Sequence, residues 1–372
     1  VWYDTNNNSL KDGTEVGISG VRVELYQDTN NSGGFNGGDT FLSFDTTDAN
    51  GYYRFDNLLA GNYVVVIADD NFRTLASGDT VPGNPLLGYR SSGTTIAANG
   101  TITDATANDP DTDVDDLDDN GLTTTLASGG VDYVASAAVT LGPDALEPIT
   151  DNDPSTNPET ADGEEPNNQS NRTVDFGFYR LDLGNIVFVD ADKSGDRNAG
   201  DTLLSGASVL LYSGDNATQI QVGADGILGT TDDGTGAYVT GAGGTYAFSG
   251  LPAGDYVVRV TPPSSPIEYA STIDTASAAD TTDPDTNTDE NDNGIGENAL
   301  QVNSGVVTLT PGQGTGGAAG AVNNVVDNST ATTTDPTVDF GFIVPTYNLG
   351  NRIWFDTDND GYVVNSLSQN LQ

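Results

Sequence analysis

The sequence predicts an all-β protein made of tandem antiparallel β-sandwiches. Short runs of alternating, β-branched and aromatic residues recur along the chain, for example Val21–Tyr26, Thr40–Phe44 and Tyr63–Ile67. Clusters of Gly, Asn, Asp and Pro separate these runs, which is typical of strands joined by turns. No stretch shows sustained helical periodicity. Several short strands within about 170 residues, with turn residues between them, indicate a β-sandwich.

The order of these elements repeats along the chain. Residues 51–66 match residues 244–259 at an offset of 193, and residues 173–178 match residues 337–342 at an offset of 164. Offsets that change along a repeat indicate loops of variable length between strands that are kept. We therefore predict three parts, which are a first β-sandwich repeat at 1–180, a second at 181–345, and the first strand and partial loop of a third at 346–372.

Each predicted repeat begins with an apolar run followed by an acidic loop. In the first two loops, oxygen-bearing side chains stand at positions 1, 3, 5, 9 and 12, which is the ligand spacing of a calcium loop. The third loop keeps positions 1, 3 and 5 but has Val364 and Leu367 at positions 9 and 12, so it is incomplete. The candidate ligands are Asp4, Asn6, Asn8, Asp12 and Glu15; Asp190, Asp192, Ser194, Asn198 and Asp201; and Asp356, Asp358 and Asp360.

Two other kinds of acidic loop are further candidate calcium sites. One has the same spacing, with candidate ligands Asp28, Asn30, Ser32, Asn36 and Asp39, and its partner in the second repeat, residues 223–233, is less regular. The other opens with Asp-Pro-Asp-Thr and closes with Asp-Asn-Gly in both repeats. Its candidate ligands are Asp109, Asp111, Asp113, Asp115 and Asp119, and then Asp283, Asp285, Asn287, Asp289 and Asp292. The alternative is a solvated acidic loop without an ion.

Composition limits the possible partners. The 372 residues include 55 acidic and 11 basic side chains, for a net charge of −44. Two carboxylates about 5 Å apart repel by about 3 kcal/mol at an effective dielectric near 20, so the acidic segments either stay open or are neutralised by divalent cations. Nucleic acid is not an expected partner, because clusters of Lys and Arg are absent. No apolar run approaches the ~18 residues of a membrane span, so membrane insertion is not expected.

Catalysis is not expected either. The chain has no Cys, His or Met, which removes disulfides, zinc–thiolate sites and His-based acid–base pairs. Paired carboxylates can hydrolyse glycosides, but here they cluster in Gly/Asn loops with no acid held in an apolar pocket. Trp2 and Trp354 occupy comparable places in two predicted strands, and we interpret them as core residues rather than as a sugar-stacking platform.

The motifs Trp2-Tyr3-Asp4-x-Asn6-x-Asn8, Gly17–Tyr26 and Gly51–Val65, taken in order, resemble the B-type domains of bacterial serine-aspartate-repeat surface adhesins. The resemblance covers nearly the whole chain. It implies immunoglobulin-like or transthyretin-like sandwiches in cell-surface stalks or spacers, in which bound calcium stiffens each module. Related collagen-adhesin modules often carry an internal Lys–Asn isopeptide bond. Because Lys11 and Lys193, the two lysines, both lie in the ion loops, such a cross-link is not expected.

These observations predict a non-enzymatic, calcium-stabilised stalk, fibre or matrix element at a bacterial cell surface or in a secreted matrix. The alternative is an adhesin module that binds a surface glycan or a protein, with exposed aromatic residues at its loop tips. Short linkers predict that neighbouring repeats touch. The Leu-Gly-Asn that precedes the later acidic loops is missing before Val1 but present at 349–351. Head-to-tail joining of copies predicts such ends, and an arbitrary window cut from a longer array explains them equally well.

Overall fold

The structure is a computed structural model of the chain. It describes residues 1–13, 15–73, 83–112, 117–125, 131–143, 171–234, 236–272, 291–296, 300–311, 334–335, 337–347 and 349–350. These residues form β-strands and one 3-10 turn, η1 (Asp69–Asn71), with no α-helix among them. The predicted all-β class is therefore confirmed. None of the described segments is a helix with the length and apolar character needed to cross a bilayer.

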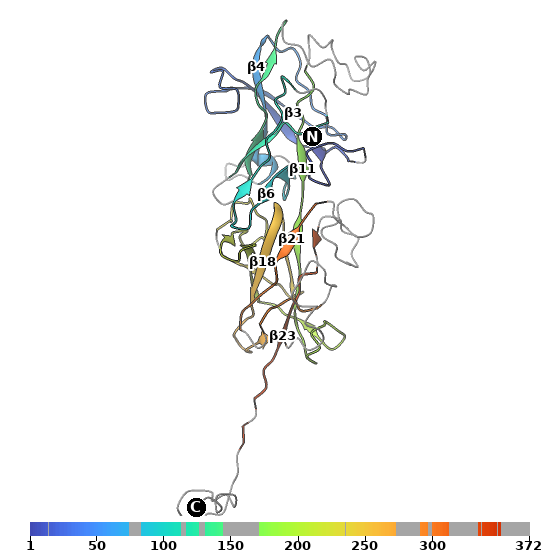
Figure 1. Cartoon of the computed structure of the whole chain (residues 1–372), viewed down its shortest axis with the longest axis vertical. Helices are drawn as coiled ribbons and strands as arrows, with labels where there is room; N and C mark the ends of the chain where they lie inside the picture. The colour runs from blue at the N-terminus through green and yellow to red at the C-terminus, as the bar shows by residue number, and fades with distance from the viewer. Residues whose placement is uncertain are drawn as a thin grey trace, which may run out of the picture.

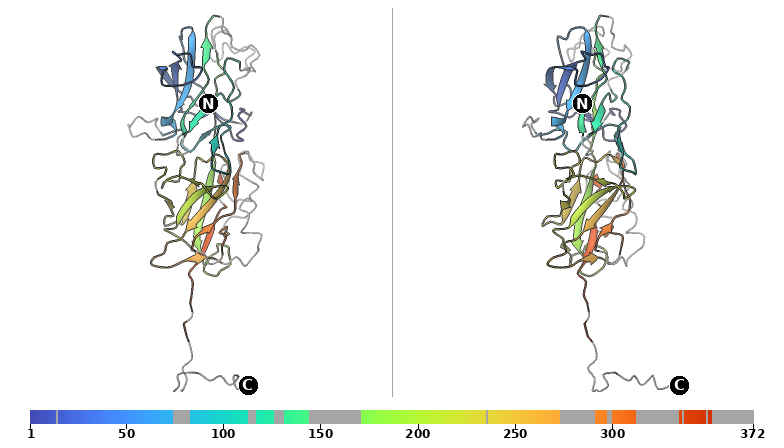
Figure 2. Two further views of the ribbon diagram at one scale, coloured as in Figure 1. Left: turned by 60° about the vertical axis from the view of Figure 1, so that its left-hand side comes forward. Right: turned by 90° about the vertical axis from the view of Figure 1, so that its left-hand side faces the viewer.

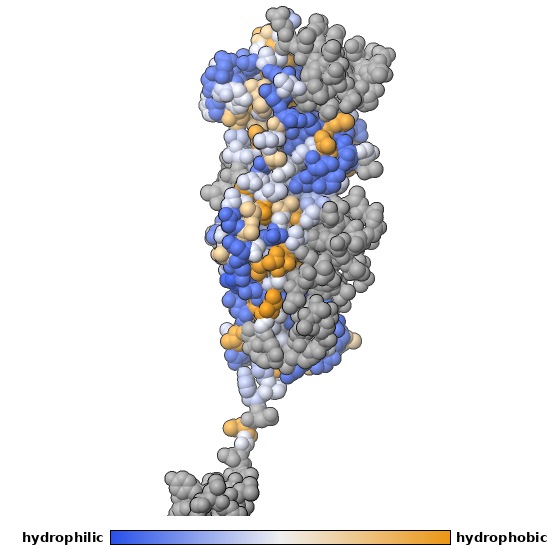
Figure 3. Space-filling model, in the orientation of Figure 1, coloured by the Kyte–Doolittle hydropathy of each residue, from blue (hydrophilic) through white to orange (hydrophobic). Residues whose placement is uncertain are grey.

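Two β-sandwiches lie end to end along the long axis of the molecule (Figures 1 and 2). The described C-terminal segment leaves the second sandwich at the end farthest from the first. Figure 3 shows hydrophilic residues over much of one face of both repeats, in keeping with the acidic composition.

The first repeat packs a larger sheet against a smaller one. The larger sheet has the order β3-β2-β4-β9-β8, with β10 also paired to β4. Its strands are β2 (Arg22–Gln27), β3 (Thr40–Thr46), β4 (Gly61–Ala68), β8 (Leu122–Thr125), β9 (Val131–Ala135) and β10 (Val139–Leu141). The smaller sheet has the order β1-β11-β5, from β1 (Trp2–Tyr3), β11 (Gly177–Tyr179) and β5 (Arg90–Ser91). β1 and β11 are parallel.

The second repeat has the same two layers. One sheet has the order β13-β12-β23-β19, with β17 and β22 also paired to β12; the other contains β15-β14-β18, with β16, β20 and β21 at its sides. The strands of the first are β12 (Asp182–Val189), β13 (Thr202–Leu203), β17 (Thr245–Phe248), β19 (Ala270–Ser271), β22 (Thr334–Asp335) and β23 (Phe340–Ile343). Those of the second are β14 (Ser208–Ser213), β15 (Gln219–Ile220), β16 (Tyr238–Val239), β18 (Ala253–Thr261), β20 (Val302–Asn303) and β21 (Val307–Leu309).

The cores follow from the two-residue period of the strands. Burial alternates along β14 and β17, so one face of each strand lies in the core. Aromatic side chains fill much of both cores, and each fully buried Phe contributes about 1.5–3 kcal/mol. Trp2 is buried, as predicted for a core residue, whereas Trp354 lies outside the described residues.

A hairpin of the first repeat packs onto the second repeat and so joins the two parts that the boundary at residue 180 was predicted to separate. It consists of β6 (Thr95–Ile96) and β7 (Ile102–Thr103), and it extends the β14–β18 sheet of the second repeat. β6 runs parallel to β18, with Thr95 opposite Ala253 and Ile96 opposite Gly254. Ile96 is buried in the core of the second repeat. The prediction that neighbouring repeats touch is confirmed.

Arg90 reinforces this joint between the repeats. Its buried guanidinium donates from Nε to the carbonyl of Gly250 (2.6 Å) and from a terminal nitrogen to the carbonyl of Leu228 (3.1 Å). The hydroxyl of Tyr179 donates to the carbonyl of Thr94 and accepts from the N–H of Ala253 (2.9 Å). These bonds join backbone groups of both repeats in a buried setting, where unmade hydrogen bonds are costly.

Candidate metal-binding loops

Three acidic loops share one backbone conformation. They cover residues 4–15, 28–39 and 190–201. Positions 4 and 6 of each loop have positive φ: 53° and 62° at Asn7 and Ser9, 54° and 80° at Asn31 and Gly33, and 62° and 83° at Lys193 and Gly195. L-residues seldom adopt this left-handed conformation, although Asn and Gly tolerate it. The same tight turn in three places indicates one loop design, and it resembles the sharp turn at position 6 of calcium loops.

The aspartate at position 1 shapes each loop from within. Asp4, Asp28 and Asp190 are all buried. Each carboxylate accepts the backbone N–H groups of positions 5 and 6, at 3.3 and 2.9 Å from Asn8 and Ser9, 3.0 and 2.9 Å from Ser32 and Gly33, and 3.2 and 2.9 Å from Ser194 and Gly195. The residues at positions 3 and 5 lie on the same tight turn.

The carboxylate at position 12 closes each loop. It accepts the N–H of position 9, from Asp12 to Glu15 (3.0 Å), from Asn36 to Asp39 (2.7 Å) and from Asn198 to Asp201 (2.7 Å). The side chain of position 9 in turn contacts positions 3 and 5. Asn198 donates to Asp192 (3.0 Å) and Ser194 (3.2 Å), Asn6 and Asn8 donate to Asp12 (2.8 and 3.1 Å), and Asn36 contacts Asn30 and Ser32. All five predicted positions therefore converge in every loop.

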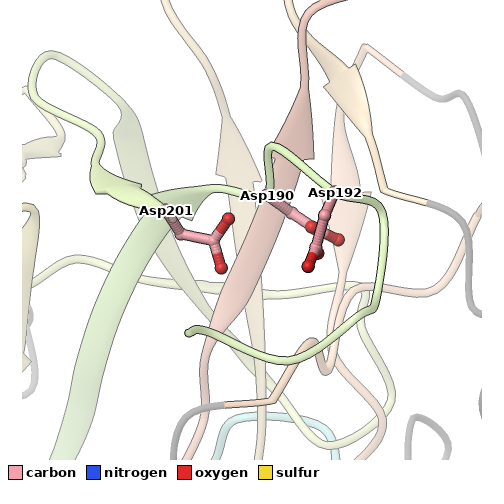
Figure 4. A group of neighbouring side chains, drawn as sticks. All are labelled: Asp190, Asp192 and Asp201. Atoms are coloured by element: carbon pink, nitrogen blue, oxygen red, sulfur yellow. The ribbon is translucent and has the colours of Figure 1, made fainter. Parts of the chain in front are cut away.

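The loop of the second repeat shows the densest charge. Carboxylate oxygens of Asp190, Asp192 and Asp201 lie within 4.8 Å of one another (Figure 4). These carboxylates repel one another, although solvent screens the exposed Asp192. Side-chain hydrogen bonds from Ser194 and Asn198 lower the pKa of Asp192, so its charge is kept. A cluster of carboxylate and amide oxygens with this repulsion has the donor set that a hard divalent cation prefers.

The equivalent loop of the first repeat also has three carboxylates among its five positions, but the charge of position 3 is moved to position 9, at Asp12. Its candidate ligands include Glu15, which also accepts the N–H of Thr5 (2.7 Å). Burial raises the pKa of Glu15, although the N–H groups of Asp12 and Thr5 oppose this effect. A cation bound beside Glu15 would favour its ionised form.

The acidic segment that starts at Asp109 meets the loop that starts at Asp28. Asp28, Asp109 and Asp111 line one cavity of about 250 Å³, together with Asn31, Asn62 and Thr140. Asp111 is held in place by the N–H (2.7 Å) and hydroxyl (2.6 Å) of Thr140 on β10. Sequence reasoning treated these two acidic segments as separate sites, and the fold brings them together.

Asp119 has a different place. It does not line that cavity, and its buried carboxylate accepts the N–H groups of Gly121 and Gly177, both at 3.1 Å. Burial raises the pKa of Asp119 well above the ordinary range of Asp. Asp292 repeats this arrangement in the second repeat, with Gly294 (2.9 Å) and Gly341 (3.0 Å) as donors. Both aspartates tie the end of the acidic segment to the last strand of their repeat.

The remaining candidate ligands lie outside the described residues. They are Asp113, Asp115, Asp283, Asp285, Asn287, Asp289, Asp356, Asp358 and Asp360.

Sequence reasoning missed how each first loop is seated. The N–H of Asp119 donates to the carbonyl of Ser9 (3.1 Å), and the N–H of Asp292 donates to the carbonyl of Gly195 (2.8 Å). Ser9 and Gly195 both stand at loop position 6. The Asp-Asn-Gly end of the acidic segment therefore supports the first loop in both repeats. The signal for this contact was the recurrence of both motifs at corresponding places, which alone does not show that they touch.

Tandem β-sandwiches with recurring acidic loops define a class of modular, repeat-built β-domains. The sequence model of the SdrD B-like domain matches residues 1–84 and 181–312, and the chain belongs to this family. This finding confirms the resemblance drawn from the motifs.

Similarity to individual proteins agrees with the family. The chain is 28% identical over 364 residues to the serine-aspartate repeat-containing protein D of Staphylococcus aureus (strain Newman), which covers 97% of the chain and 18% of that protein. It is 27% identical over 364 residues to the serine-aspartate repeat-containing protein F of Staphylococcus epidermidis, covering 97% and 14%. The chain thus spans less than a fifth of these relatives.

Among solved structures, GBS52, the minor pilin of Streptococcus agalactiae, aligns over 92% of this chain and 91% of its own at 14% identity. The TM-score of 0.25 is too low to support an argument.

Proposed function

We propose that this chain is a non-enzymatic, extracellular structural element, a stalk, fibre or matrix spacer of a bacterial cell surface, whose sandwiches are stabilised by calcium. The observation that carries the proposal is the threefold recurrence of one loop geometry, in which five oxygen-bearing positions converge. Membership of the SdrD B-like family supports the same conclusion.

Calcium would act by linkage. An ion that binds the folded loop and not the unfolded chain stabilises the fold by RT ln(1 + [Ca]/Kd), about 2.7 kcal/mol per site at a hundredfold excess over Kd. In the folded repeat it would also offset the repulsion between carboxylates such as Asp190 and Asp201. The loop would be preorganised for the ion, because backbone N–H groups fix the carboxylates at positions 1 and 12.

The first loop also connects to the joint between repeats. Asn7, at loop position 4, accepts a hydrogen bond from the N–H of Gly93 (2.6 Å). Gly93 immediately precedes Thr94, whose carbonyl accepts the hydroxyl of Tyr179 at the joint. An ion that orders this loop therefore also steadies the base of the hairpin that pairs with the second repeat. Stiffness within a repeat and between repeats would rise together, which suits a stalk.

Chelation tests the proposal. The melting temperature and the proteolysis pattern of the full chain are measured in calcium and in EDTA, with magnesium as the control ion. We expect a large drop in melting temperature and faster cleavage in EDTA, and recovery on adding calcium. Unchanged melting and cleavage after chelation would falsify the calcium role.

The alternative function is an adhesin module that binds a glycan or a protein. Its predicted signature was exposed aromatic side chains at loop tips. Phe41 and Phe44 are exposed on strand β3, Tyr52 directly after the turn at residues 49–51, and Tyr347 in the C-terminal segment, so the exposed aromatic residues are scattered rather than gathered at one loop tip. The structural role is therefore the better supported proposal.

A further inference from the structure

Strand β3 is an open edge of the first repeat. Residues Thr40–Thr46 pair with β2 on one side, and no strand of the described part of the chain pairs with their other side. All of these residues except Asp45 are exposed, including Phe41, Leu42 and Phe44. Natural sheets commonly protect an edge with Lys or Pro, with a very short strand or with a covering loop. β3 is seven residues long and contains neither Lys nor Pro.

The second repeat protects the corresponding edge. There the partner of β14 is divided into β15 and β16, two strands of two residues each, which residues 221–237 separate in the sequence. Ile220 and Val222 are buried at this edge. Because the two repeats share one sandwich, a long exposed edge strand is a feature of the first repeat and not a requirement of the fold.

Two aromatic side chains of β3 are held in position by β2. The guanidinium of Arg22 lies over the ring of Phe44, 4.5 Å from the ring centroid, and Arg22 is fixed by an ion pair with Glu24 (2.8 Å). The ring of Phe41 packs edge-to-face against Tyr26, with ring centroids 5.5 Å apart. Rings that are already ordered lose little conformational entropy when a partner covers them. The exposed rings therefore form a preorganised apolar surface beside the open edge.

The free side of β3 presents backbone groups to a further strand. The N–H of Thr47 donates to the carbonyl of Val21, directly before β2 (2.9 Å). Because backbone groups alternate sides along an extended strand, the N–H and C=O groups of Thr46 and Phe44 point to the free side. An added strand would meet these groups and the exposed aromatic rings together.

The charges at this edge indicate which strand it would accept. Residues 40–50 contain Asp45 and Asp48 and no Lys or Arg. Two copies joined through this edge would bring these carboxylates together, in chains that each carry a net charge of −44. A second copy is therefore disfavoured, and a segment with Lys or Arg between apolar residues has the complementary charge.

We propose that β3 binds an extended, basic segment of a partner protein, which adds as a strand beside Phe44 and Thr46 and covers the rings of Phe41 and Phe44. Main-chain hydrogen bonds supply the affinity of such strand addition, and side chains at alternate positions supply its specificity. This binding function goes beyond the proposed structural function and does not depend on calcium.

The probe for this site is a short, fluorescently labelled peptide of alternating Lys and Val residues. Its binding to the full chain is measured by fluorescence anisotropy at physiological ionic strength, where long-range attraction to the net charge is screened. We expect saturable binding. The same peptide with methyl groups on alternate backbone nitrogens, and a peptide of alternating Glu and Val, should each bind at least about tenfold more weakly, because the first lacks strand donors and the second has the wrong charge.

Two substitutions on β3 separate the contributions of its side chains and its backbone. Phe44→Ser should weaken binding about fivefold or more, because the ring is 55% exposed and that part remains for the partner to cover. Thr46→Pro removes one N–H from the free side, a change that edge strands tolerate, and should weaken binding about threefold or more. Val239→Ser, at an exposed valine on the corresponding edge of the second repeat, is the control and should leave binding unchanged. Melting temperatures verify that each variant is folded.

Hydrogen exchange locates the contact. Amide exchange at Phe44 and Thr46 should slow when the wild type binds the peptide. A wild type that does not bind the Lys–Val peptide, or that binds the Lys–Val and Glu–Val peptides equally, overturns the proposal. Equal binding by the wild type, Phe44→Ser and Thr46→Pro also overturns it, because the attraction would then be to net charge alone. Protection of β3 by a neutral glycan in place of the peptide would assign the edge to another class of partner and would refute the proposal as well.

Discussion

The substitution Asp190→Asn tests whether the Asp190 carboxylate binds an ion or only holds the backbone of its loop. Asp190 is buried and accepts the N–H groups of Ser194 (3.2 Å) and Gly195 (2.9 Å) and the hydroxyl of Thr272. Asparagine keeps the size of the side chain but removes the charge and replaces one acceptor oxygen with a donor. The amide nitrogen would face a backbone N–H on either side, so the loop loses at least one hydrogen bond in addition to affinity for a cation.

The expected magnitudes differ between the two ion conditions. In EDTA, weakened hydrogen bonds to a charged group cost about 1.5–3 kcal/mol. Removing the charge also relieves the repulsion with Asp192 and Asp201, which solvent weakens because neither side chain is buried, so the two effects oppose each other. In calcium, the variant also loses up to about 2.7 kcal/mol of linkage at a hundredfold excess over Kd. For a repeat of this size that equals roughly 5–11 °C in melting temperature.

Calorimetry of the full chain in saturating calcium and in EDTA measures both quantities. Glu268→Gln is the matched control, because it removes one exposed carboxylate from the same repeat. We expect the control to change neither melting temperature by more than about 2 °C. If Asp190→Asn lowered the melting temperature equally in calcium and in EDTA, Asp190 would serve the loop alone, and the ion site would be refuted.

Three other predictions address the joint, the pH dependence and the backbone. Arg90→Gln should lower the free energy of unfolding by about 2–4 kcal/mol, because two buried carbonyl groups lose their donor. It should also broaden the distance distribution in small-angle scattering, whereas the control Arg54→Gln, at an exposed arginine, should do neither. In EDTA, the contribution of Asp233 to stability should be complete below pH ~4 and be lost as the pH rises to ~7, because burial raises the pKa of Asp233 to about 7; denaturant titrations in which Asp233→Asn leaves the pH dependence unchanged would contradict this. Gly244→Ala should lower the free energy of unfolding, measured by chemical denaturation, by about 2 kcal/mol or more beyond the effect of Gly206→Ala. Both glycines have positive φ, but a Cβ at 244 would lie 2.6 Å from the Val187 carbonyl oxygen. Equal losses would show that φ alone matters.

The strands and the acidic loops could be predicted because their signals are local. The run Val21–Tyr26 became β2, and Thr40–Phe44 became β3, since alternation and turn residues are properties of short segments. The five candidate positions of each regular loop are linked by hydrogen bonds around a tight turn at positions 4 and 6, which is a local feature; that these residues bind calcium stays a prediction. The exposure of most side chains of β3 was not predictable in the same way, because it depends on β3 lying at the edge of its sheet.

Contacts between distant segments were out of reach. The Arg90 hydrogen bonds join residues 160 and 138 positions apart, and Ala270 stands at the corresponding place in the second repeat, so the repeat pattern does not mark Arg90. The role of Asp119 depends on Gly177, and the meeting of Asp28 with Asp111 depends on how two loops pack on one sheet. Composition alone suggested that all these carboxylates are equivalent candidate ligands. Their surroundings separate those on the loop surface from those buried as backbone acceptors.

The proposed calcium site and the joint between the repeats would limit different motions, and the fold connects them at one residue. Calcium would hold the loop that comes after β1, which fixes the first strand within its own repeat. The β6–β7 hairpin and Arg90 hold one repeat against the next. Asn7 belongs to the loop and receives the Gly93 N–H from the base of the hairpin, so an unfilled loop would loosen the support of the joint as well as the repeat. Between Ser91 and Asp109 the first repeat has six more residues than the second has between Ser271 and Asp283, and the hairpin lies within this longer segment. A joint built this way is thus a property of the individual repeat, and repeats that share the same sandwich can differ in how rigidly they hold the next repeat along the chain.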